Sequence, residues 1–308
     1  MPASRTLSDG PQSAIDVASG ERRALAPVPP AAGFDPDTVE VRQVRYPSQD
    51  GTSISMFLVH RKGLAPTGDH PTVLTGYGGF NISLGPGYRA ALPAWLERGG
   101  VFALPNLRGG GEYGEGWHEA GMLGDKQNVF DDVLAAADWL VAEGYTGPDR
   151  LAVWGRSNGG LLVGAAITQR PGLFRAAVCV VPLLDMLRYH RFSIAKLWVP
   201  EYGSADDPDA FRWLYAYSPY HRVRDGVCYP ATLLRTAEHD SRVDPLHARK
   251  MAARLQHATS CGGERPILLR VEAEAGHGQG KPLSKGVAEA AEEWGFVLWQ
   301  LGVAPASP

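Results

Sequence analysis

The sequence has few cysteines, no excess of charge of one sign and no apolar run long enough to cross a membrane. Its 308 residues include 30 basic and 33 acidic side chains, a net charge of −3, which gives no electrostatic reason to expect nucleic acid or an anionic membrane as a partner. The longest apolar stretches, such as residues 176–184, are about half the length of a membrane span. The N-terminus shows no basic start followed by an apolar core, the pattern of a secretory signal. We therefore predict a cytoplasmic protein without nucleic-acid or membrane partners.

The three cysteines are an odd number without metal-like spacing. Cys179 lies inside an apolar run, where a cysteine is typically a small core residue. We expect Cys228 and Cys261 to be structural or incidental, and this cysteine usage favours a reducing compartment. No cluster of residues suggests a metal or an organic cofactor, so we predict neither.

Glycine is the residue in excess, with 37 in the chain, about 12% against a usual ~7%. The hydrophobic fraction of 44% and the charged fraction of 20% exclude wholesale disorder. Residues 1–33 differ from the rest because Ser, Pro, Gly and Ala dominate, and the APVPP segment at 26–30 is incompatible with a helix. We predict a flexible tail or linker over 1–33 and one domain over 34–308.

Beyond the tail, short apolar runs alternate with segments of helical periodicity. Alternating patterns at 39–46 and 53–59, separated by a turn signal at 48–51, predict a β-hairpin. Later apolar runs predict strands at 72–75, 101–104, 151–154, 176–181, 232–234 and 267–271. Helical spacing predicts helices at 130–141, 161–167, 245–255 and 287–301. This order is typical of an α/β protein, a mostly parallel, doubly wound sheet with helices on both faces, whose site lies beyond the carboxyl ends of the strands.

The strongest motif follows the predicted strand at 151–154. Residues 155–159 read GRSNG, a G-x-S-x-G pattern that leads into an apolar helix. A sharp turn around a strained serine leaves no room for side chains at the flanking positions, which explains glycine there. The helix N-terminus behind the serine favours developing negative charge. The motif predicts an α/β-hydrolase fold with Ser157 as the nucleophile.

A serine nucleophile needs a neighbouring base, which in this fold follows it late in the chain. Of nine histidines, only His277 follows the final predicted strand, and its flanking glycines allow a loop to reach the serine. We expect His118, His190 and His221 to be surface or structural residues.

The base needs an orienting carboxylate, which we place in the loop after the strand at 232–234. Asp240 lies deepest in that loop and is the preferred acid, with Glu238 as the alternative. Asp244 precedes a proline that opens a helix, so it is predicted to cap that helix rather than to act in catalysis.

Donors for an oxyanion are expected at the residue after the nucleophile and in the loop after the strand at 72–75. The first donor is the Asn158 N–H. The loop reads GYGGF at 76–80, and its glycines could equally be ordinary turn glycines.

Several segments together resemble the prolyl oligopeptidase family of serine peptidases. They are GYGGFN at 76–81, NLRGGGEYG at 106–114, GRSNGG at 155–160, YSPYH at 217–221, HDSRV at 239–243 and GHG at 276–278. The resemblance extends from about residue 34 to the C-terminus. It implies an α/β-hydrolase domain with a Ser-Asp-His triad that cleaves after proline in short peptides.

The resemblance also implies roles for residues outside the triad. A tyrosine hydroxyl that replaces one backbone oxyanion donor matches Tyr77, and an arginine that bonds the substrate backbone matches Arg242. A tryptophan that stacks on the substrate proline ring matches Trp198. An apolar slot suits proline because an aromatic face packs on the pyrrolidine ring without needing an N–H. The other pocket walls match Phe80, Asn158, Tyr202 and Val243.

Two features depart from the family pattern. Leu183 stands where the family usually has a smaller apolar residue, which predicts a shallower or altered pocket. Full-length members also carry a β-propeller and an N-terminal segment, whereas here residues 15–23 resemble only a remnant of the last propeller blade. We expect either a propeller-less member or a catalytic-domain fragment.

The leading prediction is a serine hydrolase that cleaves acyl bonds after proline through an acyl-enzyme. A carboxylesterase acting on small esters with the same triad is the alternative, because an open mouth would weaken the positioning of a peptide. A non-catalytic binding module is the alternative of another class. An uncovered apolar surface would also favour self-association into a homo-oligomer.

Overall fold

The computed structural model describes residues 13–24, 34–87, 89–273, 275–278 and 282–304. Its centre is an eight-stranded sheet in the order β10-β9-β8-β7-β5-β6-β4-β3. The strands are β3 (Val39–Pro47), β4 (Ser53–Arg61), β5 (Thr72–Thr75), β6 (Val101–Pro105), β7 (Leu151–Arg156), β8 (Ala176–Val180), β9 (Ala231–Ala237) and β10 (Ile267–Glu272). Strand β4 pairs antiparallel with β3 and β6, and the remaining pairs are parallel. The predicted mostly parallel sheet is therefore confirmed.

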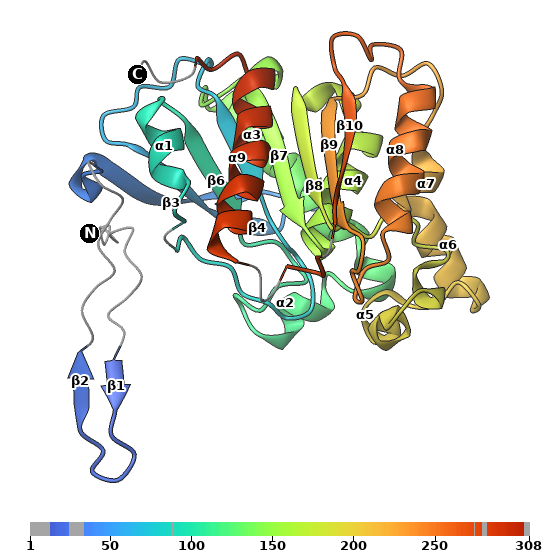
Figure 1. The fold of residues 1–308 in the computed structure, drawn as a ribbon, viewed down its shortest axis with the longest axis horizontal. Coiled ribbons are helices and arrows are strands. Elements are labelled where there is room, and N and C mark those ends of the chain that lie inside the picture. The colour runs from blue at the N-terminus through green and yellow to red at the C-terminus, as the bar shows by residue number, and fades with distance from the viewer. Residues whose placement is uncertain (1–12, 25–33, 88, 274, 279–281, 305–308) are drawn as a thin grey trace.

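Helices cover both faces of this sheet because its strands carry apolar side chains on both sides. In β7, Val153 packs in one buried cluster and Ala152 in the other, as the period-two geometry of a strand requires. Helices α1 (Leu92–Glu97) and α9 (Leu283–Gln300) cover one face, and α9 lies in front of the strands in Figure 1. Helices α3 (Gln127–Ala142), α4 (Asn158–Gln169) and α8 (Leu246–Ala258) cover the other.

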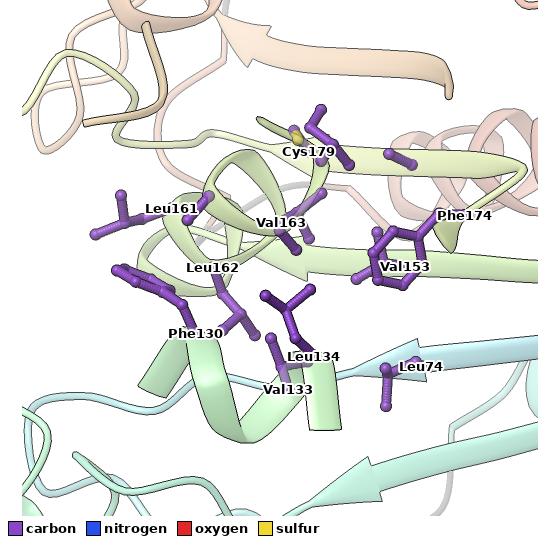
Figure 2. Close-up of a cluster of buried hydrophobic side chains, with 14 of the residues drawn as sticks. Leu74, Phe130, Val133, Leu134, Val153, Leu161, Leu162, Val163, Phe174 and Cys179 are labelled. Carbon is purple, nitrogen blue, oxygen red and sulfur yellow. The ribbon is translucent and has the colours of Figure 1, made fainter. Parts of the chain in front are cut away.

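The larger core lies between the sheet and α3 and α4. Figure 2 shows Phe130, Val133 and Leu134 of α3 beside side chains of α4 and the strands. Cys179 of β8 is buried in this cluster without a disulfide partner, as predicted. Burial of these apolar surfaces supplies the main stabilisation of the fold, at about 25 cal/mol per Å².

Every strand and helix predicted from the sequence is present, with ends shifted by a few residues. The prediction missed the shorter helices, which are α1, α2 (Glu115–Glu119), α5 (Val199–Tyr202), α6 (Pro208–Tyr217) and α7 (Pro219–Arg222). Helices α2 and α5 lie along one edge of the sheet, the lower edge in Figure 1. This edge holds the carboxyl ends of the parallel strands and the candidate site.

The described part of the predicted tail is not irregular. Strands β1 (Ser13–Ile15) and β2 (Arg22–Ala24) form an antiparallel hairpin, and residues 14–23 are exposed. The APVPP segment at 26–30 lies outside the described residues. The division of the chain at residue 33 stays a prediction.

Cys228 and Cys261, expected to be structural or incidental, form a disulfide across 33 residues, so they are structural. It joins the segment before β9 to the segment before β10. The cysteines therefore no longer support the predicted reducing compartment, since disulfides are rare in the cytosol. Among the described residues, no helix has both the length and the apolar character needed to span a bilayer.

Candidate active site

Ser157 lies at the turn from β7 into α4, and its backbone has φ 57° and ψ −118°. Non-glycine residues rarely adopt a positive φ, so the turn stores strain that the surrounding packing must hold. A Cβ at Gly155 would lie 2.0 Å from the Gly159 carbonyl oxygen, and one at Gly159 would lie 2.6 Å from the Gly76 oxygen. Both flanking glycines are therefore required, for the steric reason predicted.

Three loops bring a serine, a histidine and an aspartate together. His277, in the loop after β10, lies with Nε2 3.3 Å from Ser157 Oγ. Its Nδ1 lies 2.7 Å from Asp240 Oδ2 in the loop after β9. Arg156, at the end of β7, donates a hydrogen bond to the His277 carbonyl oxygen and so contacts the histidine loop. The arrangement can pass a proton from the hydroxyl to the imidazole while the carboxylate orients the ring.

Asp240 is the buried acid of its loop, whereas Glu238 is exposed. Asp240 Oδ1 accepts the backbone N–H groups of Arg242 and Val243, both at 2.9 Å. Burial alone would raise the pKa of the Asp240 carboxyl, but the hydrogen bonds from His277 and Val243 outweigh it and hold the pKa below its usual value. The carboxylate therefore stays ionised beside the imidazole.

Asp244 lies at the start of α8, one residue before the N-cap position, which Pro245 occupies. Its Oδ1 accepts the Leu246 N–H at 2.8 Å, where α8 begins. This hydrogen bond satisfies one of the free donors of the first helical turn.

The two predicted oxyanion donors flank the nucleophile. The Asn158 N–H is at the first residue of α4, and Tyr77 lines the same pocket as Ser157. Burial raises the pKa of the Tyr77 hydroxyl, an effect that its hydrogen bond with Ser157 only partly reverses. The hydroxyl therefore stays protonated and can donate to negative charge.

A pocket of about 210 Å³ opens beside Ser157. Its apolar walls include Phe80, Trp198, Tyr202 and Leu183 from the predicted set. The Phe80 ring meets the rings of Trp198 and Tyr202 edge to face, with centroids 6.4 and 5.5 Å apart. The pocket is therefore a small aromatic slot.

Arg242 also lines the pocket, and its side chain is exposed at the mouth. Val243 and Asn158 are buried beside the pocket rather than in its lining. The Asn158 side chain accepts from the Tyr202 hydroxyl at 2.7 Å and donates to the Tyr77 carbonyl at 2.5 Å. Asn158 thus connects two pocket residues through its side chain.

The sequence did not identify two contributors to the site. Ile82 completes the apolar lining, and Glu201 lies buried next to Tyr202 with its carboxylate against the 76–80 loop. His118, expected to be a surface or structural residue, bonds Glu201 at 2.9 Å. Within the ranges that the structure describes, no three His, Cys, Asp or Glu side chains are grouped to hold a metal ion.

In a comparison with known protein families, residues 86–304 match the prolyl oligopeptidase family of peptidases. The prolyl endopeptidase of Elizabethkingia meningoseptica is 46% identical over 275 residues, which are 89% of this chain and 39% of that protein. The prolyl endopeptidase of Dictyostelium discoideum is 45% identical over 279 residues, which are 89% of this chain and 37% of that protein. The chain spans about two fifths of the length of these relatives.

Solved structures share the whole fold. A chain from a structural and mechanistic study of two prolyl endopeptidases is 50% identical, with a TM-score of 0.88 over 95% of this chain and 42% of that one. Prolyl oligopeptidase B from Galerina marginata, bound to a 35mer hydrolysis and macrocyclization substrate, is 38% identical. The match covers 99% of this chain and 43% of that one, with a TM-score of 0.91. The predicted α/β-hydrolase fold is confirmed.

Proposed function

This chain belongs to the prolyl oligopeptidase family, and from that premise we propose that it is a serine peptidase that cleaves peptide bonds after proline. The observation that carries the proposal is the chain of contacts from Ser157 through His277 to Asp240, beside an aromatic slot. The relatives, named as prolyl endopeptidases, support proline as the residue before the cleaved bond.

In the proposed first step, Ser157 Oγ attacks the carbonyl carbon and His277 Nε2 takes the hydroxyl proton. The 3.3 Å separation of the two atoms is the loose geometry that free enzymes often show before substrate tightens it. Asp240 stabilises the imidazolium that forms. The Tyr77 hydroxyl and the Asn158 N–H then stabilise the tetrahedral oxyanion.

In the second step, the tetrahedral intermediate collapses and the carbon–nitrogen bond breaks. His277 gives its proton to the leaving amine, and the acyl group remains on Ser157 as an ester. Water, deprotonated by the same imidazole, attacks this ester and releases the peptide with a new carboxyl terminus.

Specificity follows from the shape and polarity of the slot. A proline ring suits a pocket whose walls include Phe80 and Trp198, because aromatic faces pack on its methylene groups and no N–H is left unpaired. We propose that Arg242, exposed at the mouth, bonds a carbonyl of the substrate backbone. We propose that Leu183, which is 2% exposed and lines the pocket, limits the depth of the slot.

The alternatives have less support. The named relatives are prolyl peptidases, so a carboxylesterase is not favoured, and the complete set of catalytic side chains argues against a non-catalytic module. A cytoplasmic location stays a prediction, and the Cys228–Cys261 disulfide removes its support from cysteine usage. Self-association also stays a prediction, which light scattering at micromolar concentration tests.

The experiment that tests the proposal compares kcat/KM on a peptide anilide with proline at the cleaved position, the matching alanine anilide and a short p-nitrophenyl ester. We expect proline to exceed alanine by about tenfold or more, which is about 1.4 kcal/mol of transition-state binding. Ser157→Ala is the control and should remove turnover of all three substrates. Turnover that survives this substitution, or hydrolysis without a proline preference, would contradict the proposal.

A further inference from the structure

Next to the pocket, two buried ionisable side chains and one partly buried histidine contact one another. Lys126 at the start of α3 and Glu201 in α5 have side chains that are 1% and 5% exposed, and Lys126 Nζ lies 3.2 Å from Glu201 Oε1. His118 in α2 reaches the second carboxylate oxygen with Nε2 at 2.9 Å. The mechanism above uses none of these groups, although they lie directly against the site.

The cluster holds the loop after β5 at two successive peptide groups. Glu201 Oε1 accepts the Phe80 N–H at 3.1 Å, and Lys126 Nζ donates to the Gly78 carbonyl oxygen at 2.9 Å. Phe80 is a wall of the pocket, and Tyr77, the proposed side-chain donor to the oxyanion, directly precedes Gly78. One buried ion pair therefore fixes the segment that carries both functional residues.

This loop needs such a partner because its backbone is strained. Phe80 and Asn81 have φ values of 58° and 56°, in the left-handed region that costs a side-chain-bearing residue about 1 kcal/mol or more. A Cβ at Gly79 would lie 3.0 Å from Glu201 Oε1, so the carboxylate touches the backbone of the loop. Without the carboxylate, the strained residues lose one of the contacts that hold them.

Glu201 is also adjacent in the chain to residues of the aromatic wall of the pocket. It precedes Tyr202 in α5, and Trp198 lies immediately before that helix. A second link runs in parallel, because the Tyr202 hydroxyl bonds the Asn158 side chain, which in turn donates to the Tyr77 carbonyl. Besides the ring contacts of Phe80, two polar links thus join the aromatic wall to the oxyanion loop, one through the Glu201 carboxylate and one through the Asn158 amide.

We propose that Glu201 is a positioning residue, which Lys126 and His118 hold in place so that it sets the loop of Tyr77 against Ser157. A buried ion pair is by itself weak support for stability, because desolvation offsets the attraction between the charges. Here the carboxylate instead bonds the backbone of a strained functional loop. The inference rests on the proposed function, since it requires that Tyr77 stabilises an oxyanion.

A kinetic double-mutant cycle of Glu201→Gln and Tyr77→Phe tests the inference. The cycle is measured as kcat and KM on the proline anilide and on the p-nitrophenyl ester. Tyr77→Phe removes one oxyanion donor and should lower kcat by about 10²–10³-fold. Glu201→Gln keeps the shape of the side chain but loses its charge, and we expect kcat to fall by about tenfold. Because Glu201 acts through Tyr77, the double variant should remain within about threefold of Tyr77→Phe alone.

Glu119→Gln is the matched control. This carboxylate follows His118 in α2 but is exposed, so its loss should change kcat by less than about twofold. His118→Ala is the milder variant for the case in which Glu201→Gln does not fold. It should lower kcat severalfold in the parent and leave it unchanged beside Tyr77→Phe.

The outcomes separate this inference from the proposed function. Losses that multiply in the double variant, on either substrate, would overturn the positioning role and leave the peptidase proposal intact. A parent protein that hydrolyses the ester without preferring proline would overturn the proposed function, while the cycle on the ester would still decide the role of Glu201.

Discussion

The buried cluster around Glu201 and the buried cluster around Asp132 have similar chemistry but different neighbours. Asp132 in α3 bonds the Arg108 guanidinium at 2.7 Å and accepts the Arg108 N–H at 3.0 Å. Asp50, in the turn between β3 and β4, contacts the same guanidinium at 2.5 Å. The Tyr46 hydroxyl donates to the Asp132 carbonyl oxygen at 2.9 Å. This second cluster joins a β-hairpin, a helix and the end of β6, and none of its members lines the pocket.

The difference indicates that one cluster of buried charges supports the stability of the fold and the other supports the geometry of the site. Burial disfavours the charged form of Arg108, but the hydrogen bonds that it donates to Asp132 and Asp50 outweigh this effect and raise the Arg108 pKa. The Arg108 guanidinium in turn lowers the pKa of Asp50 to about 2. The Asp132 cluster lies away from the pocket, whereas the Glu201 cluster holds the loop that carries Tyr77 and Phe80. We therefore expect damage to the first to reduce stability and damage to the second to reduce turnover.

The largest effect expected from this comparison is a loss of stability in Asp132→Asn. The substitution leaves the buried Arg108 without its main partner, which should lower the free energy of unfolding by about 3–5 kcal/mol. Urea unfolding measures that loss, and kcat/KM of the folded fraction should change by less than about threefold.

Asp131→Asn is the matched control, because Asp131 is adjacent, only partly buried and bonded by the Gln127 amide, which the new side chain can still accept. Its effect should stay below about 1 kcal/mol. A large loss of kcat in Asp132→Asn with stability unchanged would remove the distinction between the two clusters.

A buried histidine sharpens the comparison because it holds a pocket wall without charge. His247 Nδ1 accepts the N–H groups of Leu184 and Asp185 at 3.1 and 3.0 Å, directly after Leu183. Burial lowers the pKa of His247 to about 4, against the opposing effect of Asp185 and Asp244. The ring must be neutral at Nδ1 to accept these bonds, so its protonation would release the wall.

The second prediction is a dependence of stability on pH through His247. An unfolded histidine binds a proton near pH 6.5, whereas the folded one does so only near pH 4. Between these values the unfolded state holds more protons, so stability falls as the pH falls, by up to about 3 kcal/mol. Urea unfolding at intervals from pH 7 to pH 4 measures the slope.

His247→Asn should flatten that slope, because the Asn amide oxygen replaces Nδ1 as an acceptor and does not titrate. His257→Asn, on the exposed side of the same helix, is the control and should leave the slope unchanged. Equal slopes in the parent and in His247→Asn would show that another group governs the acid response.

The sequence predicted the parts of the site whose constraints are local. The turn around Ser157 needs glycine at 155 and 159 because a Cβ at these positions would lie 2.0 and 2.6 Å from backbone oxygens. This steric requirement is visible in the sequence as a five-residue motif. The core strands could also be predicted, because burial on both faces of the sheet produces continuous apolar runs in the sequence. His277 and Asp240 followed from the order of strands rather than from any local pattern.

The parts that the sequence did not reveal depend on partners far apart in the chain. Glu201 lies 75 residues from Lys126 and 121 from Phe80, and no period or spacing connects them. Helix α5 is four residues long, too short for a helical period to show. The disulfide likewise joins residues 33 apart, and pairing cannot be deduced from cysteine positions alone.

One missed element did carry a signal. Helix α6 begins with Asp207 followed by Pro208, and the Asp207 carboxylate accepts the N–H groups of Asp209 and Ala210. An acidic N-cap before a proline at the first helical position is the pattern used above for Asp244. Applied evenly along the chain, it would have predicted this ten-residue helix.

The smallest effect on stability is expected at Trp198, which is only partly buried and belongs to the site rather than to the scaffold. Trp198→Ala removes one aromatic wall, so the ratio of kcat/KM for the proline and alanine anilides should fall by about tenfold, roughly the 1.4 kcal/mol of an aromatic contact. Thermal unfolding should change little. Trp299→Ala, at an exposed position on α9 that does not line the pocket, is the control and should leave the ratio unchanged. A proline preference that survives Trp198→Ala would show that other pocket residues determine the specificity. Phe80 would then be the main candidate, and with it the loop that Glu201 holds.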